Sequence, residues 1–157
     1  MNETKQVIFK LDDEEYGLDI MNVNAIEKYT NIVRVPNASK FIQGIINLRG
    51  DVIPVYSLRT KFGLQSKKTN EDTKLIITKS NEMLIAFEVD SVAEILEIEN
   101  ENISAAPSIV KSVDTAYIDK VANLEGRMII LLDLGRILSD SEKDSIEKML
   151  EMNQPAN

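Results

Sequence analysis

The sequence predicts a mainly β protein of two small barrels in tandem, followed by a C-terminal helix. The chief observation is a sequence motif, Asn-Leu-x-Gly, that occurs twice, each time before an apolar run. The copies are Asn47–Gly50 (Asn-Leu-Arg-Gly) and Asn123–Gly126 (Asn-Leu-Glu-Gly). The copies begin at positions 47 and 123, an offset of 76 residues. A repeated turn and strand indicate a duplicated β unit. A position that differs between the copies is free to serve function.

The first half opens with a predicted β-hairpin. Apolar residues alternate from Val7 to Leu11, an acidic turn follows at 12–15, and alternation resumes from Tyr16. Ile20, Val23 and Ile26 then recur every three residues, which suggests a bend before a strand at 32–35. Pro36 ends that strand. One or two helical turns are expected over 38–46, with Asn37 or Ser39 as the cap.

The second half repeats this plan. Strands are predicted at 75–78 and 84–89, and Val92 and Ile95 continue the three-residue spacing at an offset of 69 from Val23 and Ile26. The change of offset from 69 to 76 places about seven extra residues at 99–121, as a loop or short helix. A polar linker at 65–72 separates the halves. The expected subdomains are 5–65 and 73–139, with the possibility that they exchange strands.

The chain ends in a predicted helix over 140–152. Ser139, Asp140 and Ser141 are good helix caps, and Ile146, Met149 and Leu150 form one apolar stripe. The simpler interpretation is that this stripe packs on the barrels. The alternative is a helix that docks onto a partner.

Composition limits the possible functions. The net charge of −8, with 18 basic and 26 acidic residues, makes nucleic acid a poor partner. The chain has no histidine and no cysteine, and thus lacks the commonest general base, metal ligand and thiolate nucleophile. We expect neither a cofactor nor a metal. No apolar stretch approaches the roughly 20 residues that span a bilayer, and no signal peptide is evident, so a cytoplasmic location is expected.

Arg49 is the position at which the repeated turns differ, because Glu125 replaces it in the second copy. Asn47 and Gly50 are most simply turn residues, since glycine and asparagine tolerate left-handed backbone. The turn does not require a guanidinium. Arg49 is therefore either an ordinary surface arginine or a recognition group whose planar fork binds carboxylates and carbonyls.

Two further interpretations stay open. Asp90 and Asp133 each adjoin an apolar strand and could form the acid/base pair of a hydrolase, although capping or solvent exposure is the favoured interpretation. Either all of a set of four apolar residues lie in the core, which is slightly favoured, or the set includes a hydrophobic strip that serves as an interface: Val23, Ile26, Val33 and Val55.

The residues carry a recognisable family pattern. Its strongest stretch is Ile46-Asn47-Leu48-Arg49-Gly50-x-Val52-Ile53-Pro54-Val55, supported by Tyr16-Gly17-Leu18-x-Ile20 and Leu131-Leu132-Asp133-Leu134. Over most of residues 5 to 139 the chain resembles the CheW family, the coupling proteins of bacterial chemotaxis. The resemblance implies two five-stranded SH3-like barrels with a pseudo-two-fold relation.

The resemblance also implies a non-enzymatic adaptor. Such proteins bridge the cytoplasmic tips of chemoreceptors (methyl-accepting chemotaxis proteins) to the regulatory domain of the histidine kinase CheA. No small-molecule substrate and no membrane insertion are implied. The receptor-binding residues transferred from the family are Arg49, Asn47, Gly50, Val23 and Val89. The kinase-binding residues nominated by position are Ile26, Gly44 and Val55.

Two positions depart from the family pattern. Many relatives have a glutamate just before the isoleucine at position 26, where this chain has Ala25. That departure puts one polar partner contact in doubt. Relatives also carry glycine near Lys120, which predicts a different local turn in this chain.

Overall fold

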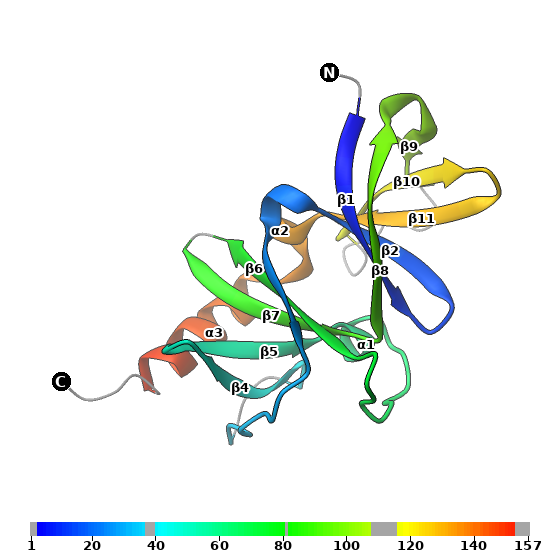
Figure 1. Ribbon diagram of the computed structural model, residues 1–157. Coiled ribbons are helices and arrows are strands. Elements are labelled where there is room, and N and C mark those ends of the chain that lie inside the picture. Colours follow the sequence, from blue (N-terminus) through cyan, green and yellow to red (C-terminus); the bar gives the residue numbers. More distant parts are fainter. Residues whose placement is uncertain (1–2, 37–39, 81, 108–115, 153–157) are drawn as a thin grey trace.

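The computed structural model describes residues 3–36, 40–80, 82–107 and 116–152, and these form two β-sheets with short helices (Figure 1). The predicted mainly β fold is confirmed. One sheet has six strands and the other five. The strand beyond the expected five is β9 (Ile103–Ala105), which lies in the stretch predicted to hold the extra residues of the second half.

The six-stranded sheet has the order β8-β1-β2-β11-β10-β9. Its strands besides β9 are β1 (Glu3–Leu11), β2 (Glu14–Asp19), β8 (Ser91–Glu99), β10 (Ile118–Leu124) and β11 (Arg127–Leu132). The 3-10 helix η1 (Ile20–Asn22) follows β2, and η2 (Asn100–Asn102) joins β8 to β9. The hairpin of β1 and β2 thus pairs with strands from the second half of the chain.

The five-stranded sheet has the order β3-β6-β7-β5-β4. Its strands are β3 (Val23–Lys28), β4 (Ile42–Leu48), β5 (Asp51–Ser57), β6 (Lys74–Ser80) and β7 (Met83–Val89). The segment after β3 turns back to β4, where Val33 and Ile45 form an isolated bridge with N–O distances of 2.9 and 2.8 Å. The two outer strands of this sheet therefore approach each other.

The two sheets repeat one pattern of strand pairing. In the parallel pair β5–β7, Val55 lies opposite Ala86, and in the parallel pair β11–β2, Leu131 lies opposite Gly17. Val55 and Leu131 differ by the offset of 76, whereas Gly17 and Ala86 differ by 69. The two pairs are therefore structurally equivalent, and each offset relates one residue of the first pair to one residue of the second. The reason is that the first hairpin of each half of the chain pairs with strands of the other half. Whether 5–65 and 73–139 act as subdomains stays a prediction.

Strands next to the junction of the sheets are buried on both faces. On β1, Val7 and Phe9 belong to the core between the sheets, whereas Ile8 belongs to a smaller core within its own sheet. On β6, Ile76 and Ile77 divide in the same way between the shared core and the core of the five-stranded sheet. Alternating side chains on one strand thus fill two cores at once, and the core shared by both sheets fixes the sheets against each other.

The C-terminal helix α3 (Asp140–Met152) packs beside the five-stranded sheet (Figure 1). Ser139 Oγ accepts the Glu142 N–H at 3.1 Å and Glu142 Oε1 accepts the Ser139 N–H at 3.1 Å, which is the capping box that the sequence predicts. Ile146 is buried in the shared core, and Leu150 packs against it. The predicted stripe therefore faces the core where it is described; the side chain of Met149 lies outside the described part.

Two local predictions are wrong or incomplete. The expected helical turns over 38–46 are replaced by β4 from Ile42 onward, and the proposed caps Asn37 and Ser39 lie outside the described residues. Ile42, Gly44 and Ile46 are buried at every second position, as a strand requires. The strand expected at 32–35 is reduced to the single bridge at Val33.

Candidate functional site

The first copy of the Asn-Leu-x-Gly motif forms the tight turn between β4 and β5. Arg49 and Gly50 lie between the paired residues Leu48 and Asp51, and both have positive φ, 52° and 90°. A two-residue loop with this geometry matches the right-handed twist of the flanking strands. Asn47 Oδ1 accepts the Gly50 N–H at 3.2 Å. The left-handed residues are thus Arg49 and Gly50, and Asn47 supports the turn through its side chain.

The second copy of the motif has the same backbone conformation. Glu125 and Gly126 have φ values of 43° and 85° between β10 and β11. The fold therefore uses this turn twice with side chains of opposite charge. This supports the interpretation that the charge at Arg49 serves something other than the turn.

Arg49 stands at the tip of its turn, with its side chain 74% exposed. Its Nη2 lies 3.2 Å from Oε1 of Glu27, a residue of β3 whose side chain is mostly covered. The contact joins the turn of β4 and β5 to β3 and narrows the directions in which the guanidinium can point. An exposed pair of this kind adds little stability, about 0–1 kcal/mol. Its main effect is to orient Arg49, and within the described residues this contact engages only part of the guanidinium, which leaves other N–H groups for a partner.

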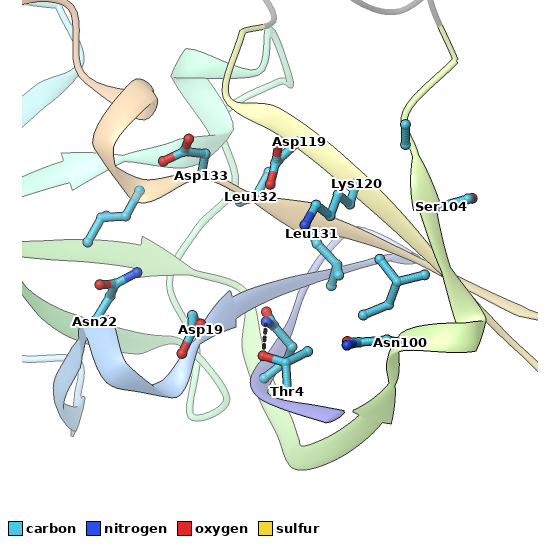
Figure 2. A pocket seen from close by; sticks show the side chains of 14 residues that line it. Thr4, Asp19, Asn22, Asn100, Ser104, Asp119, Lys120, Leu131, Leu132 and Asp133 are labelled. Carbon is cyan, nitrogen blue, oxygen red and sulfur yellow. Dashed lines mark hydrogen bonds between the residues drawn. The ribbon is translucent and has the colours of Figure 1, made fainter. Parts of the chain in front are cut away.

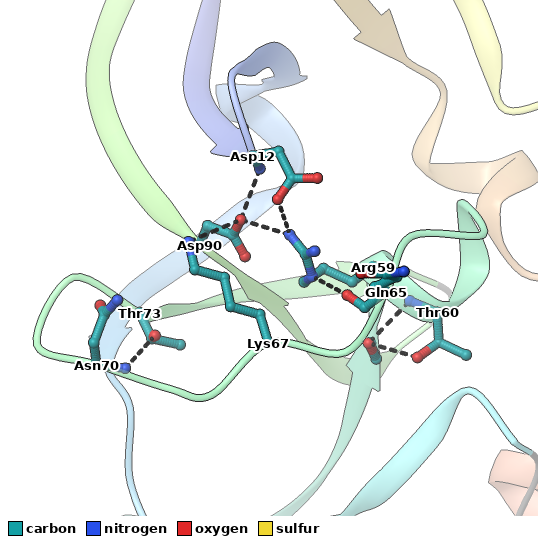
Figure 3. Close-up of polar contacts among 9 residues, drawn as sticks. Asp12, Arg59, Thr60, Gln65, Lys67, Asn70, Thr73 and Asp90 are labelled. Carbon is teal, nitrogen blue, oxygen red and sulfur yellow. Dashed lines mark hydrogen bonds and ion pairs between the residues drawn. The ribbon is translucent and has the colours of Figure 1, made fainter.

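A polar cluster that the sequence analysis missed lies where the sheets meet (Figure 3). Arg59, which is almost fully buried, follows β5 in the short helix α1 (Leu58–Lys61). Its Nη1 lies 2.7 Å from Asp12 Oδ1 and 2.8 Å from Asp90 Oδ2, and its Nε donates to the Gln65 carbonyl at 2.8 Å. Burial opposes the charge of Arg59, but the contacts with Asp12 and Asp90 outweigh it and raise its pKa.

The cluster and a helix cap account for the two acids of the hydrolase interpretation. Asp90 binds Arg59 and also accepts the Asp12 N–H at 2.7 Å. Asp133 caps the short helix α2 (Leu134–Ile137) by accepting the Gly135 N–H at 3.0 Å. The available signal was that Arg59 directly follows Leu58 at the end of a largely apolar segment, since such a charge needs a partner when buried.

Comparison with known proteins identifies the family. The model of the CheW-like domain matches residues 5–142. The chain is 34% identical to the chemotaxis protein CheW of Klebsiella aerogenes over 143 residues, covering 91% of this chain and 86% of that protein. It is 32% identical to the chemotaxis protein CheW of Helicobacter pylori over 130 residues, covering 83% and 78%.

A solved structure agrees. The crystal structure of the scaffolding protein TtCheW from Thermoanaerobacter tengcongensis superposes with a TM-score of 0.81 at 34% identity, covering 90% of this chain and 96% of that one. This protein belongs to the CheW family. The family, the chemotaxis adaptor function and the prediction that the protein is not an enzyme are confirmed by these matches.

The structure brings only some of the receptor residues transferred from the CheW family to the surface. Arg49, Asn47 and Gly50 are exposed together at one turn, and Val23 is half-buried at the start of β3. Val89 is 1% exposed and belongs to the shared core. Direct contact of Val89 with a receptor is therefore at odds with its position, because its side chain is covered on all sides.

Of the nominated kinase residues, Ile26 alone is exposed. It is 38% accessible, on the face of β3 opposite to Ala25 and Glu27. Val55 is fully buried in the core of the five-stranded sheet. Gly44 is also buried, and a Cβ there would lie 2.2 Å from the Val33 carbonyl oxygen, so only glycine fits. Gly44 and Val55 thus lie inside the sheet, and their contact with a kinase stays a prediction.

The residues of the predicted interface strip differ in burial. Val33 is exposed like Ile26, whereas Val55 is core and Val23 lies between the two classes. Ile95 of β8, which is equivalent to Ile26 at the offset of 69, is exposed as well. Each sheet therefore presents an isoleucine on its outer strand.

The two departures from the family pattern also have a structural account. Ala25 packs against the core of the five-stranded sheet, and Glu27, two residues further on the same face of β3, supplies the acid beside Arg49. Lys120 lies within β10, next to an irregularity in the pairing with β11. Lys120 thus lies in a strand, and a local backbone that differs from that of relatives stays a prediction.

Proposed function

We propose that this protein couples the cytoplasmic tips of chemoreceptors to the regulatory domain of CheA and performs no catalysis itself. The observation that carries this proposal is Arg49, a mostly exposed arginine on a rigid turn, oriented by Glu27 at 3.2 Å. Arginine on a rigid element is well suited to recognising carboxylates and carbonyls of another protein. Arg49, Asn47 and Gly50 form the receptor contact, and Val23, at the start of β3 in the same sheet, is a further receptor residue.

The kinase contact is assigned to the outer face of β3. Ile26 is a large apolar side chain exposed on an edge strand, which is the kind of residue that anchors a protein interface. Arg49 lies in the turn between β4 and β5, and Ile26 lies on β3 of the same sheet, on the face opposite to Glu27. One rigid sheet can therefore contact two partners at a fixed spacing.

The mechanism follows from this rigidity. The three cores and the Arg59 cluster hold the surfaces in one arrangement, so a change in the receptor reaches the kinase as a change in geometry. Each contact can be weak, in the micromolar range, because many simultaneous links add to the strength of an array.

The proposed location is the cytoplasm, with recruitment to membrane-associated receptor arrays. In the described part of the chain, none of the helices is long and apolar enough to cross a membrane. The receptors would supply the membrane attachment.

The test is binding of a soluble receptor signalling fragment to the variant Arg49→Glu. We expect the affinity to fall at least about tenfold, because the reversed charge repels what Arg49 attracts. Glu125→Ala is the matched control, since it alters the equivalent turn of the other sheet and should bind as the wild type does. Normal receptor binding by Arg49→Glu would remove the basis of the assignment.

A further inference from the structure

We propose that a hollow at one end of the five-stranded sheet binds an acidic segment of a partner protein. The hollow has a volume of about 760 Å³. It lies between the segment that follows β3, the first residues of β4, the end of β7 and the linker after α1. Among the described residues that line it, three are cations, Arg34, Lys40 and Lys67, and one is an acid, Glu88. The lining therefore attracts an anion, although the chain as a whole carries a net charge of −8.

Arg34 is the cation that most clearly lacks a partner. The chain has five arginines, and all but Arg34 lie within 3.4 Å of an acidic side chain. Arg34 is exposed and makes no ion pair with any residue that the structure describes, although acidic residues outnumber basic ones by 26 to 18. A guanidinium in this state can bind a carboxylate of another protein through two N–H groups at once.

The two lysines of the hollow are also available to a ligand. Lys40 is exposed, and its Nζ lies 5.0 Å from the centre of the Phe41 ring, a contact that does not neutralise its charge. Lys67 Nζ is 3.7 Å from Asp90 Oδ2, which Arg59 already binds at 2.8 Å (Figure 3). Asp90 thus neutralises Arg59 first and Lys67 only in part. The hollow therefore keeps most of its positive charge.

The six-stranded sheet has a hollow at the equivalent end, and its charge is opposite (Figure 2). Asp19 in that hollow corresponds to Glu88 at the offset of 69. Asp119 corresponds to Gln43 at the offset of 76. The charged residues described there are three carboxylates and one ammonium: Asp19, Asp119, Asp133 and Lys120. The fold thus forms a hollow twice without setting its charge, as it does with the two Asn-Leu-x-Gly turns. The charge is free to serve recognition.

The rest of the lining favours a protein segment over a small anion. Three apolar side chains that are wholly or partly covered lie among the cations: Ile32, Val35 and Ile42. A small anion such as phosphate makes no use of apolar surface. A segment with an apolar side chain between carboxylates can bury that side chain while the carboxylates reach the cations. The volume also lies in the range of about 300–1,000 Å³ that is typical of ligand sites.

That the segment belongs to a partner protein rests on the proposed adaptor function. The seven residues of β4 lie between the hollow and Arg49, a span of about 20 Å. An acidic segment in the hollow would therefore not compete with the receptor for Arg49. The exposed Ile26 is apolar and gives little specificity. Complementary charge fixes the orientation of a partner and rejects partners of the wrong charge.

The first experiment titrates ¹⁵N-labelled protein with a short capped peptide in which glutamates flank one leucine, and follows amide shifts by NMR. We expect saturable shifts at Gln43, Thr69 and Glu88, with a dissociation constant on the order of 1 mM. The same peptide with glutamine in place of glutamate should bind at least about tenfold more weakly. The absence of saturable shifts at these residues, or equal binding of the two peptides, would overturn the proposal. No receptor or kinase is present, so this failure is distinct from failure of the proposed function.

Inorganic phosphate is the second probe, because it carries negative charge without an apolar side chain. It should bind more weakly than the glutamate peptide, since it gains nothing from the apolar part of the lining. Tighter binding of phosphate would assign the hollow to a small anion and contradict a protein segment as its ligand.

Variants of the cations test the assigned residues. Arg34→Gln with Lys40→Gln should weaken binding of the glutamate peptide at least about tenfold. Neither residue makes an ion pair within the described part of the chain, so the fold should be little affected. The matched control, Lys10→Gln with Lys79→Gln, removes the same charge from exposed strand positions outside the hollow and should bind as the wild type does. Equal weakening by the control pair would contradict a specific site.

Glu88→Gln gives a test in the opposite direction. It removes the acid of the hollow, so the affinity for the glutamate peptide should rise at least about twofold. Glu82→Gln removes the same charge from the exposed turn of the same hairpin and should leave the affinity unchanged. No rise for Glu88→Gln, or an equal rise for Glu82→Gln, would show that the hollow does not hold the peptide.

A last arm tests a partner protein as the source of the segment. Co-sedimentation with CheA and receptor-containing membranes measures how much of each variant enters the assembly. The Arg34 and Lys40 double variant should be incorporated at least about threefold less than the control pair. Equal incorporation would contradict a partner in this assembly as the source. Failure of the wild type itself to enter the assembly would instead count against the proposed function.

Discussion

Arg59 and Asp90 form a nearly buried ion pair at the point where β7 of one sheet passes into β8 of the other, with Nη1 2.8 Å from Oδ2. Asp12, in the turn between β1 and β2, binds the same guanidinium nitrogen at 2.7 Å. The cluster thus ties the exchanged hairpin of the first half to the five-stranded sheet. Removing Arg59 is costly because it leaves the nearly buried carboxylate of Asp90 without its closest cationic partner.

Arg59→Met is therefore expected to lower the free energy of unfolding by about 3 kcal/mol or more. For a chain of this length, this corresponds to a loss of about 6–12 °C in the melting temperature. Thermal and urea unfolding followed by circular dichroism measure the effect. Lys68→Met removes a charge from the exposed linker and should change stability by less than about 0.5 kcal/mol. Equal stability of the two variants would show that the cluster does not hold the sheets together.

The contacts of Glu142 are expected to make the free energy of unfolding fall in acid. Burial alone would raise the pKa of Glu142, but hydrogen bonds from Tyr56, Lys61 and Ser139 outweigh it and hold the pKa below its ordinary value of 4.5. Tyr56 donates to Glu142 Oε2 at 2.5 Å. A carboxylate with a lowered pKa stabilises the fold above its ordinary value, and this contribution is lost as the pH falls through the folded-state pKa.

Glu142→Gln should consequently be less stable than the wild type at pH 7, and the difference should shrink as the pH is lowered below 4.5. Urea unfolding at a series of pH values measures it. Glu147→Gln, an exposed change on the same helix, is the control and should follow the wild type at every pH. A constant difference between Glu142→Gln and the wild type would contradict the linkage.

Glu88 predicts the opposite dependence. Burial raises the pKa of Glu88 above 4.5, against a hydrogen bond with Gln43 that lowers it, and Oε2 has no partner among the described residues. An acid with a raised pKa destabilises the fold once the pH exceeds its ordinary value, because the folded state must then lose its proton at a cost. Glu88→Gln should gain about 1 kcal/mol of stability at pH 7 and little at pH 4.

The control for this prediction is Glu82→Gln, an exposed substitution in the turn of the same hairpin. Unfolding of both variants at pH 4 and pH 7 separates the effect of burial from a general effect of charge. A gain in stability for Glu82→Gln equal to that for Glu88→Gln would assign the effect to net charge.

The repeat made much of the fold predictable from the sequence. The repeated motif marks both tight turns. The two sequence offsets of 69 and 76 residues reappear in the pairing of Gly17 with Leu131 and of Ala86 with Val55. Ser139 and Glu142 were predictable because a capping box is local chemistry. These features depend on residues close in sequence or on an internal copy.

The burial of several predicted site residues could not be read from the sequence, for one physical reason. Periodicity shows which residues share a face of a strand, but not whether that face is covered. Val55 and Val89 are predicted to contact partners, and the structure places each of them in one of the three cores. The sequence predicts helical turns around Gly44, whereas the structure has a strand there. The need for glycine could not be predicted, because it comes from the close approach of Val33, which lies in another segment. The Arg59 cluster likewise joins residues 31 and 47 positions apart.

Ile26 is predicted to contact the kinase. Ile26→Thr keeps the β-branched shape that strands favour but replaces an exposed apolar group with a polar one, so the fold should be little affected. Binding of the isolated CheA regulatory domain should weaken at least about fivefold, and receptor binding should not change. Met128→Ser changes an exposed apolar residue of the other sheet and serves as the control. Loss of kinase binding in the control alone would move the contact to the six-stranded sheet.

Arg49 combines an unfavourable backbone with a proposed binding role, and one substitution separates the two. An ordinary residue in the left-handed region costs about 1–2 kcal/mol, whereas asparagine tolerates it. Arg49→Asn should therefore melt at the same temperature as the wild type or slightly higher, and yet lose receptor binding. Glu125→Asn relieves the equivalent turn and should gain the same stability without losing the receptor. If Arg49→Asn kept its receptor affinity, the guanidinium would not be the recognition group, since the turn itself is preserved in both variants.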